Sequence, residues 1–289
     1  MKIIIPTTIK SIDVKKLPII LLDEKGLKIS IEGLSAKEKE EFFGIKNFRI
    51  KEDGGIQWTP KTSSRQMDDF DLSDYLQGSY KIMIEKNTGN PAEIQDIARE
   101  LFFIFNIVIG CSFKFYRISD IKDFPGGMFT SRIPHVSRRE NEKIDRNKID
   151  RVSGLLKKMR QIKNIKTIDK LKFIELLLET AMSQTTNKGS AGAFYVAILE
   201  SIFLQDSNAG SRYKFSMRIA RHNNENWEYK KKMRDLYDKR SSMFHGAKDD
   251  FSEGEIKFLE EEACSAIEKY INNREDFSEE NLDRELLNL

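Results

Sequence analysis

The distribution of proline constrains this chain more than any other feature of its sequence. All six prolines lie within the first 134 residues, and none occurs after Pro134. Proline removes a backbone donor and its ring clashes with the preceding helical turn, so a long stretch without it favours uninterrupted helices. Apolar residues at helical spacing in this stretch predict helices at about 141–162, 168–184, 190–206, 211–223, 225–246 and 253–273. The second part of the chain should therefore be a helical bundle.

The first part of the chain has a different pattern, of short apolar runs separated by turn residues. The runs that predict strands are KIII, LPIILL, LKISIEGL, NFRIKEDGGIQWTP and YKIMIEKNTGNP, and Gly54–Gly55 and Asn87–Pro91 interrupt them as hairpins or loops do. Pro91 suits the first turn of a helix that ends at Gly110, and the alternating run SFKFYRISDI after it predicts another strand. The stretch DFPGGMFTSRIP that follows has the composition of a domain boundary or loop.

These patterns predict an α+β fold with two domains. The first, at 1–130, is a mixed or β-rich domain of unknown role that could sense or regulate. The second, at 131–289, is an all-α bundle with a basic leading helix and an acidic C-terminal tail. A chain of 289 residues with 39% hydrophobic and 33% charged residues has enough apolar material for two cores.

Several classes of protein are not indicated. The two cysteines, Cys111 and Cys264, lie far apart, which argues against a disulfide framework and fits a reducing cytoplasm. The N-terminal run MKIIIP is too short for a signal peptide. The most apolar run, Leu101–Cys111, is about half the length that spans a bilayer, so we expect a buried core helix and no membrane partner.

Charge is distributed unevenly along the chain. Residues 131–170 contain 13 Lys and Arg against 5 Asp and Glu, whereas residues 249–289 contain 4 against 14. The basic segment could attract a phosphate backbone and the acidic one would repel it, although a charge run can also be an ordinary solvated surface. The end of the chain from Asp276 could be a last amphipathic helix or a frayed end.

The three histidines, His135, His222 and His245, form no HExxH motif, and no carboxylate cluster has the spacing of metal ligands. Phosphate-binding glycine loops are absent as well. We therefore expect neither a metal nor a cofactor. The segment that remains is LYDKRSSMFHGAK, in which Arg240 precedes His245 with four residues between.

Three segments in order give this pair its context. AFYVAILESIF contains an alanine-aliphatic-glutamate signature centred on Glu200, YKFSMRIA follows, and LYDKRSSMFHG comes last. Together they resemble the HEPN domain, specifically its ApeA-like branch, over about residues 168–275. The last segment resembles the hallmark Leu-Tyr-x-x-Arg-Ser-x-x-x-His-Gly of that family.

The resemblance implies a metal-independent endoribonuclease formed by a homodimer, in which the Arg and His of both protomers meet at the two-fold interface. It further implies a role in antiphage defence, abortive infection or a toxin system, with RNA as substrate and a possible regulatory or antitoxin partner. The catalytic residues would be Arg240, His245 and Ser241. Residues that would bind RNA or support the site are Glu200, Tyr237, Lys239 and Lys232.

Helix geometry is compatible with this role. Ser241 and His245 share a helix face, and Gly246 is suited to a left-handed cap. His245 would then lie in the last turn, where orphan carbonyls favour a protonated imidazole. We expect His245 to take the proton of an RNA 2′-hydroxyl, which attacks the adjacent phosphate and yields a cyclic phosphate and a 5′-hydroxyl. The second His245 of a dimer would act as the acid, while Arg240 steadies the phosphoryl charge.

Two other interpretations remain open. Arg240 could pair with Asp238 or with an acidic residue of the next helix while His245 only closes the helix, which would make the domain a non-catalytic module that binds RNA or a partner protein. The second interpretation is that the protein has a purely structural role in dimerisation. Glu200 would be either a buried anchor for Arg240, which we favour, or a catalytic accessory. Tyr237 would belong to the core or to a dimer contact, and the lysines at 230–232 could guide RNA or be solvated.

Overall fold

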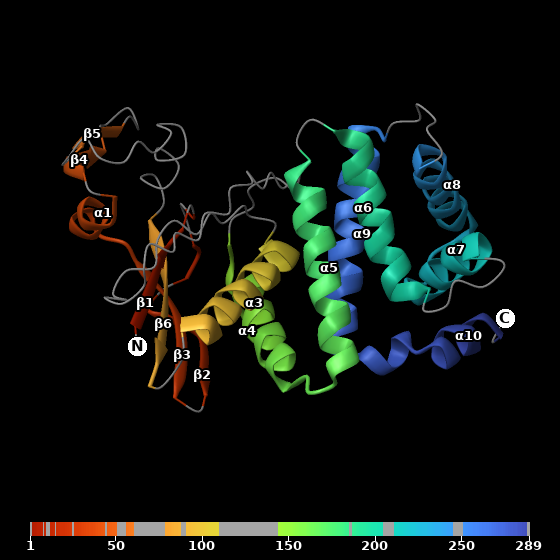
Figure 1. Ribbon diagram of the computed structural model, residues 1–289, viewed down its shortest axis with the longest axis horizontal. Helices are drawn as coiled ribbons and strands as arrows, with labels where there is room; N and C mark the ends of the chain where they lie inside the picture. The colour runs from red at the N-terminus through yellow and green to blue at the C-terminus, as the bar shows by residue number, and fades with distance from the viewer. Residues whose placement is uncertain are drawn as a thin grey trace. The chain divides into compact units, whose positions relative to one another are not determined.

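The chain forms two compact units in a computed structural model, coloured from red to blue in Figure 1. The first unit comprises Met1–Pro134 and Asn141–Lys157, and the second His135–Glu140 and Lys158–Leu289. The residues that the structure describes are 2–7, 9, 12–14, 16–24, 26–43, 45–50, 56–60, 79–87, 91–109, 144–184, 187–204, 211–244 and 251–287. In these ranges the first unit mixes strands with helices and the second is helical, so the predicted α+β class is confirmed.

A four-stranded antiparallel sheet forms the centre of the first unit. In spatial order its strands are β1 (Lys2–Pro6), β6 (Tyr80–Lys86), β3 (Leu27–Gly33) and β2 (Ile19–Glu24). Between β3 and β6, Ile29 lies opposite Ile84 and Ile31 opposite Ile82. All four side chains are at most 1% exposed, and such cross-strand apolar pairs are what set the register of a sheet. The runs KIII, LPIILL, LKISIEGL and YKIMIEK are thus strands.

Strands β4 (Ile45–Ile50) and β5 (Ile56–Pro60) pair separately as a second, two-stranded sheet. Helix α1 (Ala36–Phe43) contacts β4 and is an element that the sequence patterns did not predict. Its sequence, AKEKEEFF, is mostly charged and has too few apolar residues to show a helical period.

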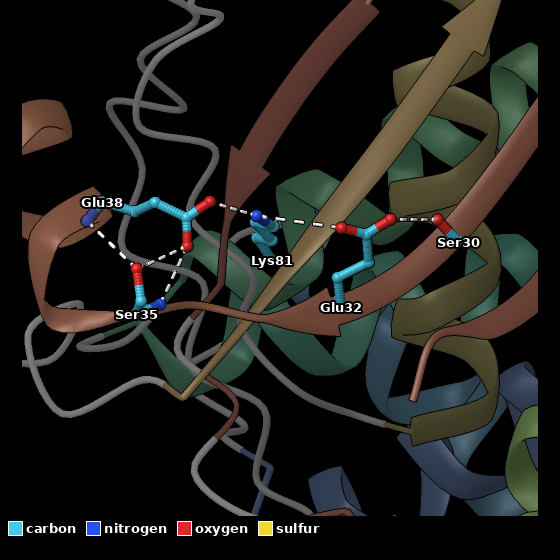
Figure 2. A network of polar contacts seen from close by, with 5 residues as sticks. All are labelled: Ser30, Glu32, Ser35, Glu38 and Lys81. Atoms are coloured by element: carbon cyan, nitrogen blue, oxygen red, sulfur yellow. Dashed lines mark hydrogen bonds and ion pairs between the residues drawn. The ribbon is translucent and has the colours of Figure 1, made fainter. Parts of the chain in front are cut away.

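The start of α1 is stabilised by a network of polar contacts, which an apolar pattern does not reveal (Figure 2). The Ser35 hydroxyl accepts a hydrogen bond from the Glu38 backbone, and one carboxylate oxygen of Glu38 accepts from the backbone and the hydroxyl of Ser35, each at 2.9 Å. This is a capping box. The other oxygen of Glu38 accepts from Lys81 on β6, whose ammonium also lies 3.8 Å from Glu32 on β3. Two carboxylates thus compensate an ammonium that is almost fully buried.

Helices α3 (Pro91–Ile109) and α4 (Arg146–Gln161) belong to the same region of the chain. Every residue from Leu101 to Ile109 is buried, as expected for a core helix. The strand predicted after α3, SFKFYRISDI, and the boundary segment after it lie outside the described residues.

The domain boundary differs from the one that we expected from the sequence. The sequence predicts that the basic segment belongs to the C-terminal domain, whereas Asn141–Lys157 groups with the first unit. Two contacts explain this: the Ser153 hydroxyl donates to the Leu21 carbonyl oxygen on β2 at 2.7 Å, and Ile144 forms a parallel bridge with Ile12. A charge count along the chain cannot reveal contacts of this kind.

The second unit is a helical bundle in its described residues. Its helices are α5 (Ile165–Ser183), α6 (Lys188–Phe203), α7 (Ser211–His222), α8 (Trp227–Phe244), α9 (Glu253–Asn272) and α10 (Glu279–Leu287). The five helices predicted from residue 168 onward are all present, and those of their ends that fall within the described residues are displaced by at most three residues. None of the helices that the structure describes is long and apolar enough to cross a membrane.

Helix α6 is the central element of this bundle. It packs against α5, α7, α8 and α9, and Figure 1 shows it between α5 and α8. It is apolar around most of its circumference, as a helix with neighbours on several sides must be. Small residues at its start allow close approach: Gly192 lies against the ring of Phe251, which precedes α9.

Helix α10 is held to the bundle by a buried arginine. Arg218 on α7 is 1% exposed and donates from Nη1 to the Phe203 carbonyl oxygen at 2.8 Å, which joins it to the end of α6. Its Nε donates to Asp283 Oδ1 at 3.1 Å, and its Nη2 to Glu279 Oε1 at 3.4 Å. The segment Glu279–Leu287 is therefore a docked helix, and two of its acidic residues are the counter-ions of a buried guanidinium.

Candidate functional site

The turn between α7 and α8 sets the direction of the helix that carries the motif. Asn224 adopts φ 54°, the left-handed conformation that often follows a helix end and that Asn tolerates better than most residues. The backbone amide of Glu225 then donates to the Ala220 carbonyl oxygen at 2.8 Å, and Asn226 Oδ1 accepts from the Tyr229 amide at 3.0 Å at the start of α8. Local polar contacts thus stabilise both the end of α7 and the start of α8.

The described part of α8 runs from Trp227 to Phe244 and includes Arg240 and Ser241. His245, Gly246 and His135 lie outside the described residues. The distance between Arg240 and His245, and the helix cap at Gly246, therefore stay predictions.

Glu200, Tyr237 and Arg240 come together at the contact between α6 and α8. Arg240 Nη2 lies 2.9 Å from Glu200 Oε2, with side chains 27% and 17% exposed respectively. Tyr237 forms a hydrogen bond with the Glu200 carboxylate, and its ring lies 5.1 Å from that of Phe215 on α7. Glu200 is therefore the acidic partner of Arg240, as the anchor interpretation predicts. The alternative partner, Asp238, pairs with Arg212 on α7 instead.

The electrostatics of this cluster follow from its partial burial. Burial raises the pKa of Glu200, and this outweighs the lowering effects of the Arg240 charge and the Tyr237 hydrogen bond. Burial, together with the charge of Glu200, also raises the pKa of Tyr237, so its hydroxyl keeps the proton that it donates. Arginine carries five N–H donors in a rigid fork, so pairing with Glu200 and contact with a phosphate are compatible.

The two lysines predicted to bind or support RNA both have partners within the chain. Lys239 Nζ donates to both carboxylate oxygens of Glu255, at 2.8 and 2.9 Å. Glu255 also completes the capping box of α9 with Ser252, so Lys239 connects α8 to the start of α9. Burial raises the pKa of Glu255, but the hydrogen bonds from Lys239 and Ser252 lower it by more, so the pKa lies below its usual value. Lys232 lies with its ammonium 3.3 Å from the centroid of the Phe258 ring.

Ser241 is partly buried one position beyond Arg240. His222, which the sequence did not single out as functional, packs between aromatic rings, with centroids 5.5 Å from Phe203 and 4.5 Å from Phe277. Burial and the nearby Lys269 charge lower its pKa against a raising effect of Asp276. This is the environment of a neutral core histidine.

A second group of residues, Tyr213 on α7 with Trp227 and Lys230 on α8, is one that the sequence patterns did not indicate. The Lys230 ammonium lies 4.1 Å from the centroid of the Trp227 ring and 4.6 Å from that of Tyr213. Trp227 is 66% exposed and Tyr213 58%. The signal was present in the spacing, because Trp227, Lys230 and Arg234 follow at i, i+3 and i+7 on one helix face.

Neither a metal centre nor a known relative identifies the site. Among the described residues, no three His, Cys, Asp or Glu side chains gather where they could hold a metal ion. No protein-family model, no curated protein and no solved structure matches this chain. What the site can do must therefore be argued from its own residues.

Proposed function

We propose that the helical unit is a metal-independent endoribonuclease of the HEPN type, acting as a homodimer in antiphage defence, abortive infection or a toxin system. Arg240 and His245 would be its catalytic residues, with Ser241 beside them. The observation that carries the proposal is the contact of Arg240 with Glu200 and of Glu200 with Tyr237. Two segments that resemble the family in sequence, some 40 positions apart, supply the residues of one cluster.

The chemistry follows from the properties of the side chains. His245 removes the 2′-hydroxyl proton, and the oxygen attacks the adjacent phosphorus, which gives a 2′,3′-cyclic phosphate. The bond to the 5′-oxygen breaks, and that oxygen takes a proton from the second His245 of the dimer. Arg240 donates hydrogen bonds to the phosphoryl oxygens as their charge grows. Glu200 would be a positioning residue, since its carboxylate holds the Arg240 guanidinium.

A second candidate is a non-catalytic module that binds RNA or a partner protein. The internal pairing of Lys239 with Glu255 favours it, because this lysine already has a carboxylate partner. Under this alternative the same residues stabilise the bundle only.

The test is cleavage of RNA by the purified protein with a metal chelator present. We expect cleavage products with cyclic phosphate and 5′-hydroxyl ends. His245→Ala should reduce the rate about 10²–10⁴-fold, the usual contribution of a general acid or base. Arg240→Ala should reduce it by about 10²–10³-fold. Loss of cleavage on chelation, or full activity of His245→Ala, would refute the mechanism.

The matched control is Arg284→Ala on α10. Arg284 is also ion-paired, with Glu280 at 2.8 Å, but is 62% exposed and far from the motif in sequence. It should cleave like the unmodified protein. Glu200→Gln keeps an oxygen that can accept from Arg240, so it should retain more activity than Glu200→Ala. Equal activities of these two variants would remove the positioning role of Glu200.

A further inference from the structure

The start of α8 and the first turn of α7 carry exposed aromatic rings around a lysine. Tyr213, on α7, and Trp227, the first residue of α8, are each more than half exposed. Lys230 is only 7% exposed, because its ammonium lies over the faces of both rings. A fixed positive charge thus lies between two rings that each keep most of their surface in solvent.

The surrounding charge is positive. Residues 211–244 contain ten Lys and Arg against four Asp and Glu, whereas residues 253–287 contain four against twelve. The α7–α8 segment therefore has a net positive charge that suits an anionic chain, whereas the segment of α9 and α10 has a net negative charge that would repel one.

Trp227 and Lys230 lie in line with part of the motif along α8. Trp227, Lys230, Arg234, Tyr237 and Ser241 follow at i, i+3, i+7, i+10 and i+14, which places them on one side of the helix. At 1.5 Å per residue this row is about 21 Å long. It begins at the exposed rings and ends beside Arg240.

We infer that Trp227 and Tyr213 form a stacking site for bases of single-stranded RNA, with Lys230 holding the two rings in place and Arg234 meeting the phosphates. Every base has a π-face, so such a site binds unpaired strands with little sequence preference, and phosphate contacts make the binding depend on salt. The inference rests on the proposed function for the identity of the strand. It adds a binding site that lies about 20 Å from Arg240 along the helix.

The experiment uses the full chain and a 2′-O-methyl oligouridine, which lacks the attacking hydroxyl and cannot be cleaved by the proposed mechanism. The chain has two tryptophans, so Trp58→Phe leaves Trp227 as the only indole. Stacking should quench its fluorescence as the oligonucleotide is added. Anisotropy of a labelled oligonucleotide should show that Trp227→Ala and Tyr213→Ala each weaken binding about tenfold, while Trp227→Phe retains most of the affinity.

A matched control and a salt series separate recognition from folding. Phe173 on α5 is also an exposed aromatic residue, at 52%, so Phe173→Ala should bind like the unmodified protein. Arg234→Gln should reduce the slope of log affinity against log salt by about 0.7, the effect of one phosphate contact on a single strand. A side chain with only a structural role would not change this slope.

Each outcome has a distinct meaning. Binding that is about tenfold weaker in Trp227→Ala and unchanged in His245→Ala supports the stacking site, whether or not the protein cleaves RNA. If cleavage also fails in the unmodified protein, the ribonuclease proposal falls and the stacking site stands. Unchanged affinity of both aromatic variants, or no quenching of Trp227 by the oligonucleotide, would overturn the inference and direct attention to a protein partner for these rings.

Discussion

At Gly192, helix α6 lies directly against the ring of Phe251, the residue two positions before α9. There is no space at this point for a side-chain carbon. A Cβ atom at this position would lie 2.5 Å from Cδ2 and 2.7 Å from Cδ1 of Phe251, and closer still to Cγ. Phe251 is 1% exposed, so its ring is enclosed and has little room to move away. Gly192→Ala is therefore a direct test of this packing.

Two opposing effects decide the sign of the change. Alanine is favoured over glycine inside a helix by about 1 kcal/mol, which would stabilise the variant. Carbon atoms pack best at about 3.5–4.0 Å, so several contacts would each be roughly 1 Å too short. Overpacking of a core typically costs about 1–3 kcal/mol, and a clash with three ring atoms belongs at the upper end. We expect Gly192→Ala to lower the free energy of unfolding by about 2 kcal/mol net.

Urea unfolding followed by circular dichroism measures this free energy. Gly254 on α9 and Gly154 on α4 are the matched controls, since a Cβ on either would meet nothing within 4 Å. Their alanine variants should be as stable as the unmodified protein or up to about 1 kcal/mol more stable. In a Phe251→Ala background the clash is absent, so Gly192→Ala should there become stabilising. A Gly192→Ala variant that is at least as stable as the unmodified protein would refute the reasoning.

Three further predictions concern other contacts in the helical unit. Asp283→Asn should lower the free energy of unfolding by about 2 kcal/mol in urea titrations, because Arg218 stays buried with a weaker acceptor; an unchanged midpoint would contradict this. Asn224→Ala should lose about 1 kcal/mol and Asn224→Gly should not, because only glycine adopts a positive φ without cost; equal stability of the two would contradict it. Burial lowers the pKa of Lys170 from 10.5 to about 8, although the nearby Tyr270 ring favours the charged form. Between these two pH values the unfolded chain binds a proton at Lys170 that the folded chain does not. The free energy of unfolding, compared with that of Lys170→Met, should therefore rise with pH from about 8 to 10. A difference between the two proteins that does not change with pH would show that burial does not control the pKa of this amine.

The helices of the second unit could be predicted because their signal is local. Apolar residues recur at helical spacing from Ile165 to Asn272, and glycine or asparagine residues interrupt them, so the pattern in one window determines each helix. Helix α1 could not be found in this way. Its capping box is readable from Ser35 and Glu38, but the salt bridge to Lys81 joins positions 43 residues apart.

The candidate site shows the same division. The motif around Arg240 was readable as a string, and the Glu200 signature identified its partner. The pairing of Lys239 with Glu255 was not readable, because either residue could equally have been solvated. The role of Arg218 was missed for the same reason: in the sequence it is one arginine in an amphipathic helix, and its carboxylates lie more than 60 positions later.

The pairing of Arg218 on α7 with Glu279 and Asp283 on α10 also determines when during translation the charge of Arg218 can be neutralised. The arginine is synthesised 65 positions before Asp283, which takes about 3–13 seconds at the usual elongation rate of about 5–20 residues per second. During that interval α7 can form but cannot bury its guanidinium against its final counter-ions. A chain that terminates before Glu279 would leave the buried Arg218 guanidinium without these two carboxylates. Such a chain should be a good substrate for quality-control proteases. The ion pairs of α7 can therefore form only once α10 has been made.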